Sequence, residues 1–326
     1  MSALLKTVEA EGATPAWSDR EIALPGAFRL ANGQQLADAR LRVRLHGDPG
    51  APVIAAAGGI SASRAVAGDE AGWWRDCAGP GRAIDTRNYC LLGFDFLPNP
   101  GEPKVTLTTG DQARALACAL DALGVDALRA FVGASYGGMV ALAFAAAYPD
   151  RVQKLVAISA ADRPHGFGVA IRGVQRRILA FAAAQGKAED GVSLARQIAM
   201  LSYRSPEEFD TRFEVCPPQD AGGAYPHCDY LVSRGEAFSM EPDRYLALSD
   251  SIDRHAVDIA SVRAPSLFIA AQSDLIAPPA QIRRLAAAAP RARYIEIFST
   301  YGHDAFLKET AAIGPFITRF LEEDRK

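Results

Sequence analysis

One serine of the chain lies in a pattern that is typical of a catalytic nucleophile. Ser135 stands in the frame Gly133-Ala134-Ser135-Tyr136-Gly137, between an apolar run and an alanine-rich run with helical spacing. A nucleophilic serine on a sharp strand-to-helix turn needs small neighbours, because larger side chains would collide with the strand and the helix. The pattern therefore predicts that Ser135 is a nucleophile. The alternative is a serine that only packs in a tight turn.

Two later segments can supply the base and the acid that such a serine requires. His303 follows the last predicted strand, in RYIEIFSTYGHDAF, and Asp274 follows the strand before it, in SLFIAAQSDLIAPP. In such a triad the serine Oγ hydrogen bonds to Nε2 of the histidine, and Nδ1 hydrogen bonds to the carboxylate. We expect Ser135, His303 and Asp274 to form this triad. Asp162, which follows an earlier strand, is the alternative acid.

The oxyanion of an acyl-transfer reaction needs two backbone N–H donors. The N–H group of Tyr136, at the start of the helix after the nucleophile, is one candidate. The second should come from the turn after an early strand, and IAAAGGISASR ends such a strand in small residues. We expect this donor to be Gly59 or Ile60. The alternative is that the glycines serve only the geometry of the turn.

Strands and helices alternate along most of the chain, which predicts a parallel sheet with helices on both faces. FRLANGQQLADARLRVRLHG reads as a hairpin around Asn32-Gly33, and Thr109 or Asp111 is a candidate cap for the helix that follows. From residue 162 to residue 263 the pattern is mostly helical. We interpret residues 1–161 and 264–326 as a core domain and residues 162–263 as a helical lid over the carboxyl edge of the sheet.

Composition excludes several classes of protein. The chain has 326 residues and a net charge of −3, so no basic surface favours nucleic acid or an anionic membrane. Five cysteines without metal-site spacing indicate free thiols in a reducing compartment. The first residues include acidic ones where a signal peptide needs an apolar core, and no apolar run reaches the roughly 20 residues of a membrane span. We predict a cytoplasmic protein that needs no metal and no bound cofactor.

Charged residues near the triad suggest an acceptor other than water. Asp304, directly after His303, could hold an ammonium group, and the first lid helix carries Arg172, Arg176 and Arg177. Arginine binds carboxylates through two parallel hydrogen bonds. An acid and an arginine on opposite sides of Ser135 would fit the α-amino and α-carboxyl groups of an amino acid. The alternative is that these arginines form a solvated helix face.

Several segments together resemble the homoserine O-acyltransferase family of α/β-hydrolase-fold enzymes. They are GASYGGMVALAFAAAYPDRV, LSYRSPEEFDTRF, YLVSRGEAF, RYLALSDSIDRHAVD, SDLIAPP and GHDAFL. The resemblance implies the triad named above, with Asp304 on the acceptor's ammonium and Arg176, or its neighbour Arg177, on its carboxylate. It also implies an acyl-CoA co-substrate, a ping-pong reaction through an acyl-serine, a role in methionine biosynthesis and a homodimer through the lid helices.

The chain departs from the family at the oxyanion turn, where AAAGGISASR replaces a His-Ala-Leu-Thr-Gly type of stretch. Arg64 follows this turn. If it points inward it could pair the free carboxylate of a succinyl group, and if it points outward it is a surface arginine. We favour succinyl-CoA over acetyl-CoA as donor. Three alternatives remain: serine as acceptor for cysteine synthesis, an esterase or thioesterase that uses water, and a non-catalytic binding protein.

Overall fold

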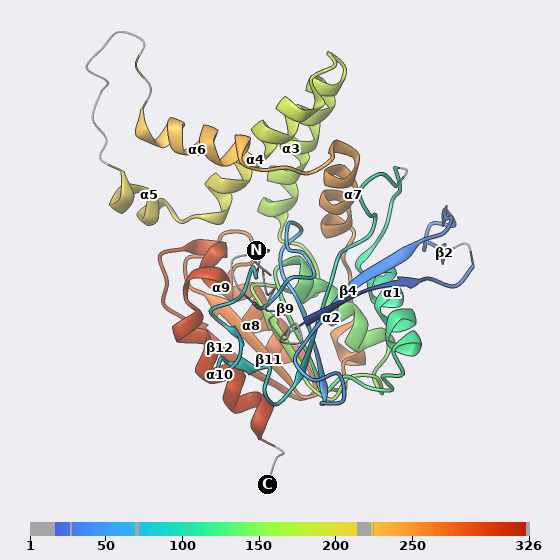
Figure 1. The fold of residues 1–326 in the computed structure, drawn as a ribbon. Helices are drawn as coiled ribbons and strands as arrows, with labels where there is room; N and C mark the ends of the chain where they lie inside the picture. Colours follow the sequence, from blue (N-terminus) through green and yellow to red (C-terminus); the bar gives the residue numbers. More distant parts are fainter. Residues whose placement is uncertain are drawn as a thin grey trace, which may run out of the picture.

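The computed structural model describes residues 17–26, 28–68, 72–102, 104–213, 223 and 225–323, and its centre is a sheet of eight strands (Figure 1). The first two pairings, β1 with β4 and β4 with β8, are antiparallel, and every later pairing is parallel. The mostly parallel sheet that the alternation predicted is confirmed. In spatial order the strands are β1 (Trp17–Ala23), β4 (Arg40–His46), β8 (Cys90–Phe94), β5 (Val53–Ala57), β9 (Ala130–Ala134), β10 (Leu155–Ile158), β11 (Ser266–Ala271) and β12 (Ala292–Ile297).

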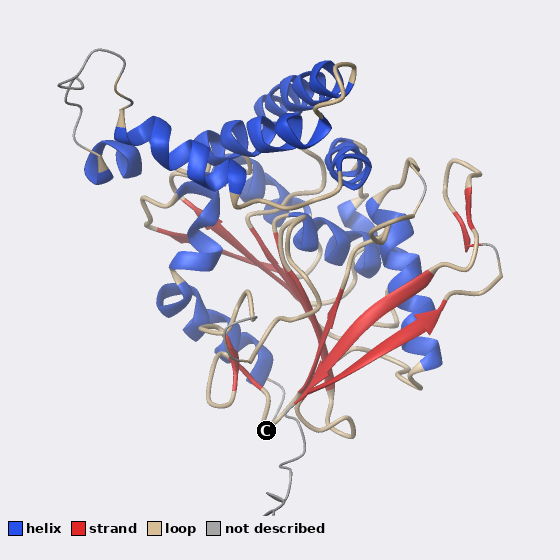
Figure 2. Cartoon of the chain, turned by 45° about the horizontal axis from the view of Figure 1, so that its top comes forward, coloured by secondary structure: helices blue, strands red, loops and turns tan. Residues whose placement is uncertain are grey.

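The central strands are buried on both faces, as parallel strands between helical layers must be. In β5, Val53 and Ala55 pack into one hydrophobic cluster and Ile54 and Ala56 into another. Helices flank both faces of the sheet (Figure 2). The first cluster includes side chains from α1 (Thr109–Ala122), α2 (Tyr136–Ala147) and α8 (Pro279–Ala288), and the second includes side chains from α9 (Ala305–Lys308) and α10 (Thr310–Glu322).

Two local expectations have different outcomes. The predicted hairpin is confirmed: β2 (Phe28–Arg29) pairs antiparallel with β3 (Gln35–Leu36). The predicted caps of α1 are wrong, because the N-cap is Thr108, whose hydroxyl accepts from the backbone N–H of Asp111. The Asp111 carboxylate accepts in turn from the backbone N–H of Thr108, which completes a capping box. Two further two-residue strands, β6 (Ala78–Gly79) and β7 (Ile84–Asp85), pair with each other.

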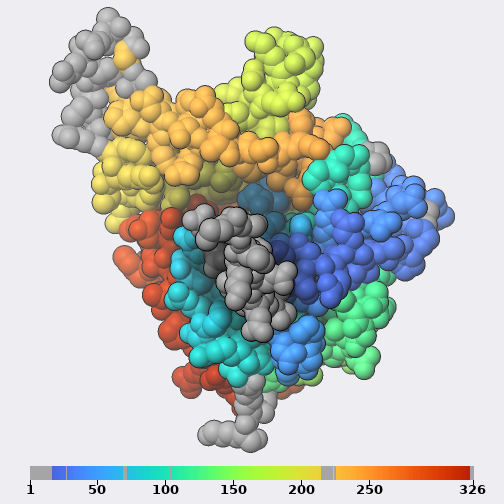
Figure 3. All heavy atoms as spheres, in the orientation of Figure 1, coloured from blue at the N-terminus to red at the C-terminus, as the bar shows by residue number. Residues whose placement is uncertain are grey.

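A group of helices lies between β10 and β11 and covers the carboxyl edge of the sheet (Figures 1 and 3). The boundaries at residues 162 and 263 stay a prediction, but these helices all lie between them. The group is called the lid below. It consists of α3 (Gly166–Ala183), α4 (Ala188–Tyr203), α5 (Pro206–Arg212), α6 (Pro226–Glu236), α7 (Pro242–Asp253) and the 3-10 turn η1 (Ile259–Ser261).

Of the described helices, none is long and apolar enough to cross a membrane. Four cysteines in the described ranges are free, namely Cys77, Cys90, Cys118 and Cys228. Cys216 and the first sixteen residues, on which part of the localisation prediction rests, lie outside the described residues. The same ranges contain no group of three or more histidine, cysteine or acidic side chains that could hold a metal ion.

Candidate active site

The turn between β9 and α2 holds Ser135 in an unusual backbone conformation, with φ 54° and ψ −123°. The two glycines of the motif are required by close contacts. A Cβ at Gly133 would lie 2.3 Å from the carbonyl oxygen of Gly137, and one at Gly137 would lie 2.2 Å from the carbonyl oxygen of Ala57. The sequence motif is thus a steric requirement of a turn in which strand, helix and β5 come into backbone contact.

His303 connects Ser135 to Asp274 through two short hydrogen bonds. The Ser135 Oγ lies 2.7 Å from Nε2 of His303, and Nδ1 lies 2.8 Å from Oδ2 of Asp274. The second carboxylate oxygen accepts from the backbone N–H groups of Ile276 and Ala277, which fixes its orientation. His303 and Asp274 are 4% and 2% exposed. This is the geometry in which a histidine can remove a proton from a serine hydroxyl.

Two carboxylates set the charge state of His303. Burial lowers its pKa, but the charge of Asp274, the hydrogen bond that His303 donates to that carboxylate and the charge of Asp304 outweigh burial, so the pKa is raised. Burial also raises the pKa of Asp304, against the charges of Arg204, His303 and Arg196. The alternative acid, Asp162, lies elsewhere: its carboxylate pairs with the neighbouring Arg163.

The residues expected to supply the oxyanion donors line the cavities at Ser135. The backbone N–H groups of Tyr136, Gly59 and Ile60 donate no hydrogen bond to any described residue. By contrast, the N–H of Gly137 donates to the carbonyl of Gly58 at 2.7 Å, which ties the two turns together. Ile60 and Tyr136 line a cavity at Ser135. A Cβ at Gly59 would contact nothing within 4 Å, so steric crowding does not explain that glycine.

Two cavities meet at the nucleophile and share Ile60, Ser135, Tyr203, Ile252 and His303. The first encloses about 40 Å³ and is called the Arg172 branch. The second encloses about 150 Å³ and is called the Asp304 branch. Lid side chains contribute to both, so the lid forms part of the site. The Arg172 branch adds Tyr136, Met139, Ser159, Pro164, His165, Ile171, Arg172, Gln175, Ser202, Tyr245, Ser249, Ile276 and Ala277, and the Asp304 branch adds Gly59, Ser61, Ala62, Trp73, Arg196, Asp304, Phe306 and Leu307.

The Asp304 branch holds the expected acid, Asp304, together with an arginine, Arg196, that sequence reasoning did not single out. Arg196, on α4, lies over the rings of Tyr203 and Phe238, at 5.5 and 4.8 Å from their centroids. No described carboxylate forms an ion pair with Arg196, whereas Asp304 lies 3.3 Å from Nε of Arg204. The available signal was spacing: Arg196 and Tyr203 are seven residues apart, which places them on one face of a helix.

Arg176 and Arg177 do not line either branch, contrary to the expectation for the acceptor's carboxylate. Arg176 contacts Oδ2 of Asp253 at 2.7 Å and donates to Oγ of Ser249 at 3.0 Å. Arg177 lines an apolar groove on the outside of the lid. The reason is the orientation of α3, whose buried positions include Arg172, Gln175 and Leu179.

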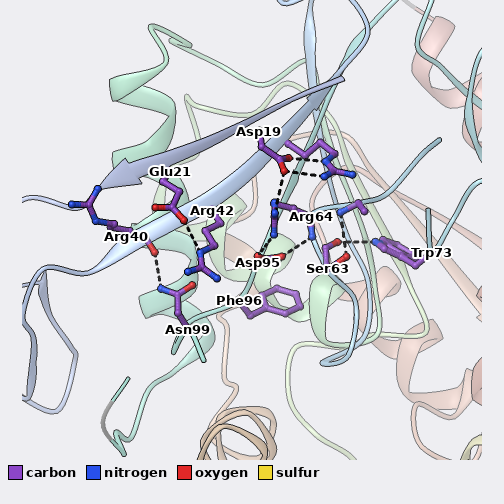
Figure 4. A network of polar contacts seen from close by, with 12 residues as sticks. Asp19, Glu21, Arg40, Arg42, Ser63, Arg64, Trp73, Asp95, Phe96 and Asn99 are labelled. Atoms are coloured by element: carbon purple, nitrogen blue, oxygen red, sulfur yellow. Dashed lines mark hydrogen bonds and ion pairs between the residues drawn. The ribbon is translucent and has the colours of Figure 1, made fainter. Parts of the chain in front are cut away.

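Arg64 is also absent from both branches, so it does not occupy the place expected for a succinyl-binding residue. Figure 4 shows its guanidinium between two carboxylates, with Nη1 2.8 Å from Asp95 and Nη2 3.0 Å from Asp19. Its backbone N–H also donates to Asp95, and the Trp73 indole donates to the carbonyl of Ser63. The bonds to Asp19 and Asp95 attach the segment after the oxyanion turn to the side of the sheet that carries the antiparallel strands.

Comparison with known proteins gives a consistent result. The family model described as "alpha/beta hydrolase fold" matches residues 76–310. A homoserine O-succinyltransferase of Xanthomonas campestris is 42% identical over 291 residues, 86% of this chain and 79% of that protein. A homoserine O-acetyltransferase of Thermus thermophilus is 37% identical over 77% of this chain and 72% of its own length.

Among solved structures, the fold matches a homoserine O-acetyltransferase from Bacillus anthracis with a TM-score of 0.85. The two sequences are 19% identical, and the match covers 94% of this chain and 98% of the other. At that identity the structural similarity shows only the fold, whereas the two relatives with higher sequence identity show the family. The chain therefore belongs to the homoserine O-acyltransferase family of the α/β-hydrolase fold.

Proposed function

We propose that the protein is an acyl-CoA:L-homoserine O-acyltransferase that acts in methionine biosynthesis in the cytoplasm. The observation that carries this proposal is the pair of opposite charges, Asp304 and Arg196, in a cavity that also contains Ser135 and His303. An α-amino acid carries its ammonium and its carboxylate on one carbon atom, so it can contact an acid and an arginine of the same cavity at once. A site that binds an uncharged ester does not need such a pair of charges.

In the first half-reaction, His303 accepts the hydroxyl proton of Ser135, and Oγ attacks the carbonyl carbon of the acyl thioester. The oxyanion is held by the N–H of Tyr136 and that of Gly59 or Ile60. The C–S bond breaks, His303 returns the proton to the sulfur, and coenzyme A leaves as the thiol. An ester between the acyl group and Ser135 remains.

In the second half-reaction, homoserine enters the Asp304 branch, with its ammonium on Asp304 and its carboxylate on Arg196. His303 accepts the proton of the γ-hydroxyl, the alkoxide oxygen attacks the acyl carbon, and the ester to Ser135 breaks. Ser135 recovers its proton from His303, and O-acyl-homoserine is released. Asp274 fixes the ring and stabilises the imidazolium that forms in each half.

The donor that we favour is succinyl-CoA. The relative from Xanthomonas campestris is named a homoserine O-succinyltransferase, and it is more similar to this chain than the relative from Thermus thermophilus, which is named an acetyltransferase. The small Arg172 branch also suits a short acyl group. No metal ion or bound cofactor enters this mechanism, in which acyl-CoA is a co-substrate.

The proposal also includes a homodimer that is formed through the lid. An apolar groove of about 730 Å³ runs along the outside of α3 and α4. Its walls include Phe181, which is 72% exposed, and Leu201, which is 51% exposed. A contiguous patch of exposed apolar side chains of this kind marks an interaction site. A second copy of the chain is the partner that the family resemblance implies.

The test is the release of coenzyme A by the purified protein. Succinyl-CoA and acetyl-CoA are each offered with L-homoserine, with L-serine and with neither. We expect release that requires homoserine, faster with succinyl-CoA. Ser135→Ala should lower kcat by roughly 10⁴- to 10⁶-fold, as removal of a triad member does elsewhere.

Each alternative has its own result in this experiment. Equal release without an amino acid would identify a hydrolase, and a requirement for serine would identify the one-carbon-shorter acceptor. Absence of release, together with failure of a fluorophosphonate to label Ser135, would identify a binding protein. A Ser135→Ala variant that keeps more than a tenth of the activity would remove this residue from the role of nucleophile.

A further inference from the structure

The corner of the lid between α4 and α5 packs against the loop that carries the catalytic histidine. Gly302 of this loop has a positive φ of 58°, and a Cβ there would lie 2.7 Å from the carbonyl oxygen of Tyr203. The hydroxyl of Ser205 donates to the carbonyl oxygen of Thr300 and accepts from the backbone N–H of Glu208 at 3.1 Å. The first turn of α5 is thereby held on the loop.

This contact brings three buried charged side chains together. Oδ2 of Asp304 lies 3.3 Å from Nε of Arg204, and Oε1 of Glu208 lies 3.7 Å from Nη1 of the same guanidinium. The three side chains are between 8% and 13% exposed. Two acids therefore share one base below the surface. Arg212 also contacts Glu208, at 3.3 Å, but its side chain is 41% exposed, so water screens its charge.

The surplus negative charge of this group faces the cavity. Asp304 lines the Asp304 branch, whereas Arg204 and Glu208 line neither branch. The buried Nε of Arg204 and Oε2 of Glu208 have no hydrogen-bond partner among the described residues. The contact between Arg204 and Asp304 is thus an ion pair without a hydrogen bond. A cation that enters the branch can hydrogen bond to Asp304 while Arg204 stays behind it.

Arg204 has the strongest opposing effect on the tendency of Asp304 to bind a proton. Burial raises the pKa of Asp304, and in order of effect the charges that lower it are those of Arg204, His303, Arg196 and Lys308. His303 is neutral when it accepts a proton, and Arg196 is neutralised once the acceptor's carboxylate binds. Lys308 is exposed. The charge of Arg204 is buried and stays the same throughout the reaction.

We propose that Arg204 is a positioning residue, which keeps the Asp304 carboxylate negatively charged and directed at the acceptor's ammonium, while Glu208 shares Arg204 so that Asp304 is not fully neutralised. This inference rests on the proposed function and specifies how its acceptor site works. Neither lid residue touches the acceptor. Both act through Asp304.

The test measures how an unreactive acceptor analogue binds at different pH values. L-2-aminobutyrate is homoserine without its hydroxyl group, so it should compete with homoserine without accepting an acyl group. Asp304 holds an ammonium only when it is ionised, so binding should weaken as the pH falls through its pKa. In Arg204→Gln this pKa is higher, and at pH 5.5 we expect the inhibition constant Ki to be about 10-fold above that of the wild type. At pH 8.5 the two should agree within about threefold, because Asp304 is ionised in both.

A second ligand and two further variants are the controls. Butyrate lacks the ammonium, so Arg204→Gln should change its Ki by less than about threefold at any pH. Arg204→Lys keeps the charge and should restore the wild-type pH profile for L-2-aminobutyrate. Arg212→Gln removes the same charge from the exposed end of the group, where screening is strong, and should leave that profile unchanged.

Glu208→Gln should give a different pattern. Arg204 then pairs with Asp304 alone, so Ki for L-2-aminobutyrate should rise by a similar factor at every pH, without a displacement of the profile toward higher pH. Thermal unfolding of each variant identifies any effect that comes from loss of folded protein. If Arg204→Gln does not fold, Glu208→Gln decides, because an unchanged Ki in that variant would overturn the proposal.

The possible results separate the role of Arg204 from the reaction. A Ki that is raised equally at every pH in Arg204→Gln, or is unchanged at every pH, would overturn the role of Arg204 and leave the transferase intact. Release of coenzyme A without homoserine would overturn the transferase, and inhibition of that hydrolysis by L-2-aminobutyrate across the same pH range would still test Arg204. If the wild-type protein released no coenzyme A from any donor, both proposals would be wrong.

Discussion

His303 lies near two carboxylates, one that it hydrogen bonds and one that follows it in the chain. Burial lowers its pKa, yet Asp274 and, to a smaller degree, Asp304 raise it above the ordinary value of 6.5. In the proposed mechanism the ring must be neutral to accept a proton. Activity should therefore fall as the pH falls through this raised pKa, so that the acid side of the pH profile lies above 6.5.

Asp304→Asn tests both effects of this carboxylate. The variant loses one group that raises the pKa of His303, so the acid side of the kcat/KM profile should move to lower pH. It also loses the partner for the acceptor's ammonium, so the KM for homoserine should rise by about 10-fold or more. Steady-state kinetics between pH 5 and pH 9 measure both quantities.

Asp304→Glu is the matched control, because it keeps the charge and moves it by one methylene. It should keep most of the displacement of the pH profile while it raises KM. If Asp304→Asn left both the profile and the KM unchanged, the acceptor would bind elsewhere and the role of Arg196 would need a new argument.

The nucleophile and its two proposed partners could be predicted from the sequence. Ser135 follows β9 directly, Asp274 and His303 lie in the loops after β11 and β12, and each strand has a clear apolar pattern. The charged residues of the lid were less accessible. Arg172, Arg176 and Arg177 are close neighbours on one helix, and only its orientation against the core decides which one faces the cavity.

Among the secondary-structure elements, the nucleophile turn is the most constrained. Gly137 lies where α2 passes the backbone of β5, and there is no room for a methyl group. Gly137→Ala must therefore displace either the helix or the strand. We expect it to lower the free energy of unfolding by about 1 to 3 kcal/mol and to abolish acyl transfer, because Ser135 loses its position. Thermal or urea unfolding and the assay of coenzyme A release measure the two effects.

Gly59→Ala is the matched comparison. Its Cβ would contact nothing within 4 Å and its φ is not positive, so the unfolding midpoint should stay close to that of the wild type. Equal loss of stability in the two variants would mean that helix propensity or backbone freedom, rather than contact with β5, explains the glycine of the motif.

The segment after the oxyanion turn shows why the direction of the Arg64 side chain could not be predicted from the sequence. Its position just after the turn allowed it to point inward or outward. The outcome depends on Asp19 in β1 and on Asp95 directly after β8, both distant from it in sequence. A contact between a loop and residues in or next to two distant strands is set by the tertiary fold, and no local sequence pattern predicts it.

For the molecule as a whole, the lid presents apolar side chains outward. Val174, Phe181, Leu194 and Leu201 are between 47% and 72% exposed and lie along one groove. Phe181→Asp would place a charge at the centre of the proposed contact between two copies. We expect the mass in solution to shift from dimer toward monomer, measured by light scattering or sedimentation across a range of concentrations.

Phe298→Asp is the control for this change, because Phe298 is 79% exposed on the core and does not line the groove. This variant should keep the wild-type mass. A wild-type protein that is monomeric at every concentration would contradict the dimer, and a dimer that survives Phe181→Asp would have to use another surface.

The two branches meet at one serine, and this junction has a consequence for the direction of flow. If the acyl arm stays in the Arg172 branch, the thiol that departs and the alcohol that arrives must use the Asp304 branch in turn. Neither can bind while the other is there. Coenzyme A that returns before homoserine would reclaim the acyl group and regenerate the thioester. The concentration of homoserine relative to free coenzyme A would then determine what fraction of the acylated enzyme forms product. The two compounds would compete for the Asp304 branch, so the reaction would respond to their ratio in the cell.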